Sequence, residues 1–304
     1  MNIGFIGLGN MGRGMASNLL TYCQTHQHQL LVLDLNQSAM DELVGQGATA
    51  ANDAQTMAQQ ADILFTSLPS AREIGELAVG EQGLLENLKS GAVWFETSTN
   101  DLAAWQALID QAPSDLLMVD APVTGGAEGA AAGTLTMLLG IEPTLFEQHQ
   151  EMLASFTNKA VRMGPSGAGY VSKLCQLHLN YLVAQGIGET LMLGARADLD
   201  LGTLYQVLQK SCAQSYVVDN YIPKVLDGSY DPSFALGLAN KDMRLITELA
   251  AHLKVPTKLA DTVYADYQEA VARFGSDAPH LKIVQMLEDE VGVSLPSSLA
   301  KHDK

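Results

Sequence analysis

The hydrophobic and polar positions divide the chain into two parts. Through residue 163, short apolar runs alternate with amphipathic segments, and several of these runs end at a glycine, a proline or an aspartate. Apolar runs of this length, bounded by turn residues, are typical of buried strands. Strands are predicted at residues 2–6, 30–33, 63–67, 93–96, 117–119, 134–139 and 160–163. Because helical patterns fall between them, we expect an α/β domain with a doubly wound parallel sheet.

From residue 164 onward the pattern is helical and contains no strong strand run. The stretch from Tyr170 to Arg196 would form a helix about 40 Å long. We therefore expect two domains. Residues 1–163 form the sheet domain, residues 164–304 form an all-helical domain, and this long helix joins them.

Lys173 is the only charged residue between Val171 and Gly188. A helix that is apolar on most faces is normally buried on most faces, and a lysine is rarely buried without a partner. On the helix alone, two interpretations stay open. The ammonium group reaches solvent while its long stem packs against the protein, or it points into a cleft and transfers a proton.

A glycine motif directly follows the first predicted strand. It consists of Gly7, Leu8, Gly9, Asn10, Met11 and Gly12. An amphipathic helix at about residues 11–22 comes next, followed by a second strand that ends at Asp34. This order of strand, G-x-G-x-x-G turn, helix, strand and acid is the fingerprint of a dinucleotide-binding unit. We therefore expect residues 1–163 to form a Rossmann-type domain that holds a pyrophosphate at the helix N-terminus.

Asp34 favours NAD over NADP. An acid at the end of the second strand suits the ribose hydroxyls of NAD, whereas the 2′-phosphate of NADP normally needs an arginine. Between Arg13 and Arg72 the chain contains neither lysine nor arginine. NAD is therefore the expected cofactor.

Composition narrows the possible partners. The chain has 304 residues, of which 47% are hydrophobic and 17% charged, and its net charge of −17 gives a pI of about 4.6. A surface this acidic repels nucleic acid and anionic lipid, so we expect neither as a partner. A bound phosphate or carboxylate must then be held locally by backbone amides, helix ends or a few cations.

The three cysteines, Cys23, Cys175 and Cys212, lie far apart and lack the spacing of a metal site, so we expect no bound metal. A sparse, odd set of thiols suggests reduced cysteines in the cytoplasm. The first residues show a strand pattern without a basic leader, and polar residues interrupt the long helix. We therefore expect neither a signal peptide nor a membrane span.

Four motifs occur in order along the chain. They are the Gly7–Gly12 turn with Met15 and Ala16, then Asp120-Ala-Pro-Val-Thr-Gly-Gly126, then Gly167-Ala-Gly-Tyr-Val-Ser-Lys173, and the segment from Phe234 through Lys241 and Asp242. Together they resemble the β-hydroxyacid dehydrogenase family, which includes 3-hydroxyisobutyrate dehydrogenase and tartronate semialdehyde reductase (2-hydroxy-3-oxopropionate reductase). The resemblance covers essentially the whole chain. It implies a Rossmann domain, a long linking helix, an all-helical domain for substrate binding and dimerisation, and a homodimer or homotetramer.

The resemblance also implies a reaction, in which a small 3-hydroxy acid is oxidised to its semialdehyde with NAD, or the reverse. Lys173 matches the family's catalytic lysine. The loop of Thr124, Gly125 and Gly126 matches the one that holds the substrate carboxylate, where serine is commoner than threonine. The positions that match the nicotinamide end of the cofactor site are Leu68, Pro69, Thr99 and Lys241.

Ordinary chemistry is consistent with these roles. Backbone amides at a Gly-Gly turn bind a carboxylate without added charge. The alcohol proton must leave as hydride moves to the nicotinamide, so a positioned acid/base is required. Burial lowers the pKa of a lysine toward neutrality in general, which suits this role.

One position departs from the family pattern. The family usually carries an asparagine three or four residues after the catalytic lysine, but this chain has Gln176 and Leu177 there. Gln176 offers the same amide on a longer arm. Asn180 lies two helical turns after Lys173 on roughly the same face. Either residue is a candidate to contact the substrate.

Other functions remain as alternatives. An imine reductase shares the same architecture but usually replaces the lysine and often uses NADP. A non-catalytic dinucleotide-binding module is a second alternative, which the retained Lys173 disfavours. An enzyme of the 6-phosphogluconate type would need a longer chain and cations for the sugar phosphate.

Overall fold

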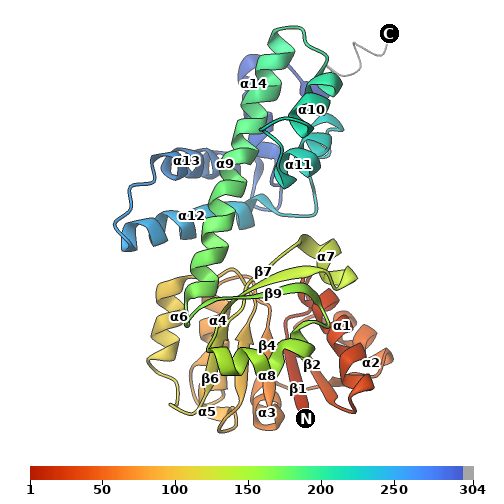
Figure 1. Ribbon diagram of the computed structural model, residues 1–304, viewed down its shortest axis with the longest axis vertical. Coiled ribbons are helices and arrows are strands. Elements are labelled where there is room, and N and C mark those ends of the chain that lie inside the picture. The colour runs from red at the N-terminus through yellow and green to blue at the C-terminus, as the bar shows by residue number, and fades with distance from the viewer. Residues whose placement is uncertain (297–304) are drawn as a thin grey trace. The chain divides into compact units, whose positions relative to one another are not determined.

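The computed structural model describes residues 1–296, and the chain forms two compact units (Figure 1). The first unit comprises Met1–Lys173, and the second begins at Leu174. The division into functional domains after residue 163 stays a prediction. The compact unit extends to Lys173 because the sheet holds the first turn of the long helix, as described below.

The first unit is built on a sheet with the strand order β3-β2-β1-β4-β5-β6-β8-β7, in which β9 also pairs with β8. Its strands are β1 (Asn2–Ile6), β2 (Gln29–Leu33), β3 (Thr49–Ala50), β4 (Ile63–Thr66), β5 (Val93–Glu96), β6 (Leu117–Asp120), β7 (Val123–Thr124), β8 (Leu135–Gly140) and β9 (Thr157–Gly164). Neighbouring strands from β3 through β6 are parallel. The order 3-2-1-4-5-6 is that of the Rossmann fold, so the predicted fold class is confirmed.

Strand β8 departs from the parallel arrangement. It pairs antiparallel with β6 and β7, and parallel with β9. Between β7 and β8 the chain contains only the short helix α7 (Gly126–Ala132). A parallel crossover needs about a dozen or more residues to return the chain along the sheet, so this connection reverses the strand instead. The antiparallel edge was not predicted from the sequence.

Helices connect the strands of the first unit (Figure 1). Besides α7 they are α1 (Gly12–Thr25), α2 (Gln37–Gly45), α3 (Ala54–Gln60), α4 (Ala71–Ala78), α5 (Leu84–Asn87), α6 (Leu102–Ile109) and α8 (Pro143–Leu153). Several begin at a residue whose side chain accepts a hydrogen bond from a backbone N–H of the first turn, which satisfies a group that the helix itself leaves unpaired. These caps are Asn36, Asp53, Ser70 and Asp101.

Two hydrophobic clusters cover the two faces of the sheet, because alternate residues of each strand point to opposite sides. On one face the rings of Phe5, Phe65 and Phe95 stack at centroid distances of 5.9 and 5.0 Å. On the other face Trp105 packs edge-on against both Trp94 and Tyr170, at 5.3 and 5.7 Å. Tyr170 thus joins the start of the long helix to the core of the first unit.

The second unit is helical within the described residues. The long helix α9 (Ala168–Arg196) starts in the first unit and continues into the second. It is followed by α10 (Leu201–Gln209), α11 (Tyr216–Leu226), α12 (Leu236–His252), α13 (Lys258–Phe274) and α14 (Lys282–Val291). Their apolar faces share one core that contains Ile222, Met243 and Tyr267, all fully buried. None of the helices described is long and apolar enough to cross a membrane.

Asp120 holds the beginning of α9. The side chain is fully buried, and its two carboxylate oxygens accept hydrogen bonds from the backbone N–H groups of Gly167 and Tyr170, at 2.7 and 3.0 Å. The backbone can approach the Asp120 carboxylate this closely only at glycine, because a Cβ on Gly140 or Gly169 would lie 2.3 or 2.8 Å from one of its oxygens. Asp120 therefore braces the beginning of α9.

We expect the stability of the protein to report on this carboxyl group. Burial raises the pKa of Asp120 from 3.8 to about 6, although hydrogen bonds from Gly167 and Tyr170 oppose the shift. A carboxyl group whose pKa is raised by folding stabilises the fold below its ordinary pKa, and this contribution is lost as pH rises through the folded pKa. Relative to an Asp120→Asn variant, the wild type should lose on the order of 3 kcal/mol between about pH 4 and pH 7. Urea unfolding of both proteins across this range measures the difference, and a pH-independent difference would contradict the prediction.

Candidate functional site

The glycine fingerprint forms the turn that a dinucleotide needs. Gly7 has a φ of +94°, and a Cβ there would lie 2.2 Å from the carbonyl oxygen of Ser67. A Cβ on Gly12 would lie 1.8 Å from the carbonyl oxygen of Gly7, whereas a Cβ on Gly9 would meet no atom within 4 Å. The first and third glycines are thus required by packing, and the second leaves open space beside the N-terminus of α1. This is the arrangement by which a pyrophosphate approaches the backbone, so the residues present fit the cofactor.

Asp34 is fixed beside this turn. One of its carboxylate oxygens accepts a hydrogen bond from the N–H of Leu8, and the other accepts one from Asn36 at 2.7 Å. The acid at the end of β2 is thereby held against the fingerprint, where the ribose hydroxyls of a dinucleotide lie in this fold. Arg13, the nearest cation in the sequence, pairs with Glu42 on α2 at 3.2 Å.

The loops after β4 and β5 contain the residues expected at the nicotinamide end. Leu68 and Pro69 follow β4, and Thr99 follows β5; Leu68 and Thr99 are partly buried, and Pro69 is exposed. The N–H of Leu68 donates to the hydroxyl of Ser98 at 2.8 Å, which ties the two loops together. The structure therefore brings these predicted cofactor residues together at the carboxyl ends of neighbouring parallel strands.

The predicted carboxylate loop lies after β6. Thr124 is half-buried, and Gly125 and Gly126 are exposed with φ angles of +130° and +68°. Such angles are accessible mainly to glycine, so the loop needs both residues. The loop leaves its backbone on the surface of the first unit, where amide groups can meet an anion.

Lys173 ends the first unit. Its residue is 7% exposed, which is low for a lysine. A lysine whose ammonium group reached solvent from the first turns of α9 would keep that charged end in water even with its stem packed, which leaves more of the side chain exposed than is seen here. The burial thus disfavours the snorkelling interpretation and favours the one in which the ammonium group faces the interior.

Three further candidates belong to the second unit. Gln176 is exposed, whereas Asn180 is half-buried and its side-chain oxygen accepts a long hydrogen bond of 3.5 Å from the hydroxyl of Tyr221. Lys241 on α12 forms an ion pair with the neighbouring Asp242, with 3.3 Å between nitrogen and oxygen. The other oxygen of Asp242 accepts a hydrogen bond from Tyr181 of α9 at 2.9 Å. Within this unit, α9 and α12 are therefore joined next to Lys241.

Sequence reasoning missed Glu96. It is the last residue of β5, its register partner on β6 is Asp120, and both side chains are fully buried. The available signal was a charged residue at the end of an otherwise apolar strand, followed by polar Thr97 and Ser98. The pattern alone predicts Glu96 only as the end of the strand at residues 93–96.

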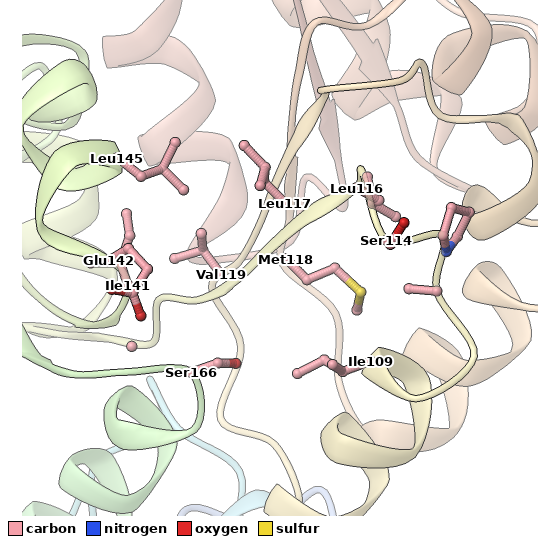
Figure 2. A pocket seen from close by; sticks show the side chains of 13 residues that line it. Ile109, Ser114, Leu116, Leu117, Met118, Val119, Ile141, Glu142, Leu145 and Ser166 are labelled. Atoms are coloured by element: carbon pink, nitrogen blue, oxygen red, sulfur yellow. The ribbon is translucent and has the colours of Figure 1, made fainter.

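A separate hollow of about 270 Å³ lies beside β6, between the end of α6 and the start of α8 (Figure 2). Figure 2 shows Leu117, Val119 and Leu145 among the side chains that line it, so its wall is largely apolar. None of the residues predicted for cofactor or substrate binding lines this hollow. We assign it no role in the reaction.

Comparison with known families agrees with the fold and the fingerprint. A model described as the NAD binding domain of 6-phosphogluconate dehydrogenase matches residues 2–164. A second model, described as NAD-binding of NADP-dependent 3-hydroxyisobutyrate dehydrogenase, matches residues 167–287. The two matches meet at the start of α9.

Individual relatives cover nearly the whole chain. NAD-dependent L-serine dehydrogenase of Pseudomonas aeruginosa is 32% identical, over 94% of this chain and 97% of its own length. 2-(Hydroxymethyl)glutarate dehydrogenase of Eubacterium barkeri is 31% identical, with 97% of each chain covered. The crystal structure of 3-hydroxyisobutyrate dehydrogenase from Salmonella typhimurium superposes with a TM-score of 0.80 at 27% identity, covering 94% of this chain and 99% of that one. With both halves matched by family models and relatives above 30% identity, the chain belongs to the β-hydroxyacid dehydrogenase family of NAD-dependent oxidoreductases.

Proposed function

We propose that the protein oxidises a small 3-hydroxy acid to its semialdehyde with NAD, or catalyses the reverse reaction, and that Lys173 is the acid/base. The observation that carries the proposal is the burial of Lys173 at the family's catalytic position, at 7% exposure on an otherwise uncharged stretch of α9. NAD, when bound, accepts the hydride. The chain's own residues must then bind the acid and remove the alcohol proton.

The names of the relatives support a class of substrate. L-Serine, 2-(hydroxymethyl)glutarate and 3-hydroxyisobutyrate each carry a primary alcohol on the carbon next to the one that bears the carboxylate. They differ in the group on that middle carbon, which is an amine, a carboxyethyl chain or a methyl group. We propose that this chain acts on an acid of the same shape, with the middle substituent as the open variable.

Binding of the carboxylate is assigned to Thr124, Gly125 and Gly126. A protein with a net charge of −17 gains nothing from its overall field when it binds an anion. Backbone amides and one hydroxyl at an exposed glycine turn can hold the carboxylate locally. Lys241, paired with Asp242, adds a cation in the second unit at the position that the family uses next to the cofactor.

Proton transfer is assigned to Lys173. In the oxidative direction an uncharged amine accepts the proton of the alcohol as the hydride departs. In the reductive direction the ammonium group donates it to the developing alkoxide and stabilises that charge. An amide from Gln176, one turn further along α9, would hold the substrate in line for this transfer.

The predicted homodimer or homotetramer and the predicted cytoplasmic location are not needed for this chemistry. Exposed apolar side chains on α9 support self-association, since Leu179 and Leu193 are 64% and 74% exposed.

Cofactor preference should follow from Asp34. We expect NAD to be favoured over NADP by at least about tenfold in kcat/KM, because the carboxylate repels a 2′-phosphate and the chain has neither lysine nor arginine between Arg13 and Arg72. Asp34→Ser combined with Leu35→Arg should move the preference toward NADP. Leu35 is fully exposed, whereas Asn36 caps α2 and is best left in place. Steady-state kinetics with both cofactors test this, and equal use of NADP by the wild type would refute it.

The amide on α9 can be identified by alanine substitution. If Gln176 holds the substrate, Gln176→Ala should lower kcat/KM by about ten- to a hundredfold, as expected for one positioned hydrogen bond near charge. Asn180→Ala is the matched comparison, because it removes a shorter amide two turns from Lys173. An unchanged rate for Gln176→Ala with a large loss for Asn180→Ala would transfer the role to Asn180.

Lys173 provides the decisive test of the reaction. Lys173→Ala should lower kcat by at least about a hundredfold, the low end for loss of an acid/base. Lys173→Arg should be nearly as slow, since arginine keeps its proton at any working pH. NAD binding should change little, because the fingerprint glycines and Asp34 are untouched. Turnover of a panel of 3-hydroxy acids, followed by absorbance of the reduced cofactor, measures the loss; retained turnover by Lys173→Ala would remove this residue from the site.

A further inference from the structure

Two buried carboxylates hold Tyr170 from opposite ends. Asp120 accepts a hydrogen bond from its backbone N–H at 3.0 Å, and Glu96 accepts one from its phenol hydroxyl. The two acids end the neighbouring parallel strands β6 and β5 and are register partners. Tyr170 is itself fully buried and lies three residues before Lys173 on α9.

Glu96 has a second set of contacts on the side of the cofactor loops. Its other oxygen accepts hydrogen bonds from the hydroxyl of Ser98 and from the backbone N–H of Ser98, the latter at 3.1 Å. The same Ser98 hydroxyl accepts the N–H of Leu68 at 2.8 Å. A hydroxyl has a single proton. Because that proton is directed to Glu96, the lone pairs of Ser98 are available for Leu68.

These bonds form one continuous chain. It runs from the amide of Leu68, through Ser98 and Glu96, to the phenol of Tyr170 in the first turn of α9. A buried carboxylate is costly to leave without donors, so each bond depends on the others being made. This series of hydrogen bonds joins the loop expected at the nicotinamide to the helix that carries Lys173.

We propose that Glu96 is a positioning residue that couples the cofactor loop at Leu68 to the first turn of α9. Glu96 touches neither reactant in this assignment; it acts through Ser98 on the loop and through Tyr170 on the helix. The relevance to catalysis rests on the proposed function, in which Lys173 is the acid/base. The coupling itself requires only that Leu68 lies in the cofactor site.

Tyr170→Phe tests the coupling, because it removes the hydroxyl at the α9 end of this series of hydrogen bonds and leaves the ring in place. NAD should then bind with a Kd raised by roughly three- to tenfold, although Tyr170 lies at the opposite end of the hydrogen-bond series from Leu68. With a working 3-hydroxy acid, kcat at saturating NAD should fall by about tenfold. Both tryptophans of the chain, Trp94 and Trp105, lie in the same cluster as Tyr170. Their fluorescence can follow the NAD titration, with calorimetry as a second measurement.

Tyr230→Phe is the matched control. Tyr230 in the second unit also donates its phenol hydroxyl to a buried carboxylate, that of Glu288. Its loss should lower the melting temperature in the same way but leave the Kd for NAD and kcat unchanged. Glu96→Gln is the second variant, which keeps the shape of the side chain and serves if Tyr170→Phe does not fold. In the double variant of Tyr170→Phe and Glu96→Gln, the increase in Kd should be no larger than that of the worse single variant, because both changes break the same series of hydrogen bonds.

The outcomes separate the coupling from the proposed function. A folded Tyr170→Phe or Glu96→Gln protein with wild-type Kd for NAD would overturn the coupling, as would an equal rise in Kd for Tyr230→Phe. A raised Kd with wild-type kcat would overturn the part that concerns Lys173. Full turnover by Lys173→Ala would instead refute the acid/base assignment, and the NAD titrations would still decide whether Glu96 couples the loop to the helix.

Discussion

The buried acids at the ends of β5 and β6 impose the constraint on which the candidate site depends. Glu96 and Asp120 are each fully buried, and neither is tolerable there without donors. The donors come from the phenol and the N–H of Tyr170, from Gly167 and from Ser98. Since the acids are fixed by the strand register, their donors must be placed to match, and the start of α9 is thereby located against the sheet. Two charges that are expensive to bury thus specify where one helix begins.

The cofactor site relies on shape and amide groups instead of positive charge. A side chain at Gly7 or Gly12 would collide with the backbone, and Gly9 leaves open space beside the turn. Asp34 accepts a hydrogen bond from Leu8 within the turn that these glycines make. With a net charge of −17, an exposed lysine at this site would help an anion to bind, yet the chain has neither lysine nor arginine between Arg13 and Arg72. Helix N-terminal amides hold a pyrophosphate without discriminating between cofactors. We propose that Asp34 makes this discrimination by repelling the 2′-phosphate of NADP.

Local sequence patterns predict part of this structure, but not the features that depend on packing between segments distant in sequence. The parallel strands and the fingerprint turn were predictable because apolar runs and glycine spacing are local signals. The reversal of β8 was not, since it depends on how far α7 can carry the chain. Lys173 was recognisable as unusual, but the helix pattern alone did not decide whether it is buried. Glu96 stood out only as a charged residue at the end of an apolar strand. Its pairing could not be predicted, because its donor Tyr170 is 74 residues away.

The buried acids affect the proposed chemistry by fixing the rotation of α9 about its axis. Successive residues of a helix are rotated by about 100°, so a slip of one residue at the start would turn Lys173 away from its present direction. The same slip would rotate Gln176 and Asn180, which continue on the same helix. Asp120 opposes it through two backbone N–H groups, and the close packing at Gly169 leaves no room for a side chain there. Glu96 opposes it through the phenol of Tyr170. Asp120, Gly169, Glu96 and Tyr170 therefore decide which side chains of α9 are available for the proton transfer that we propose.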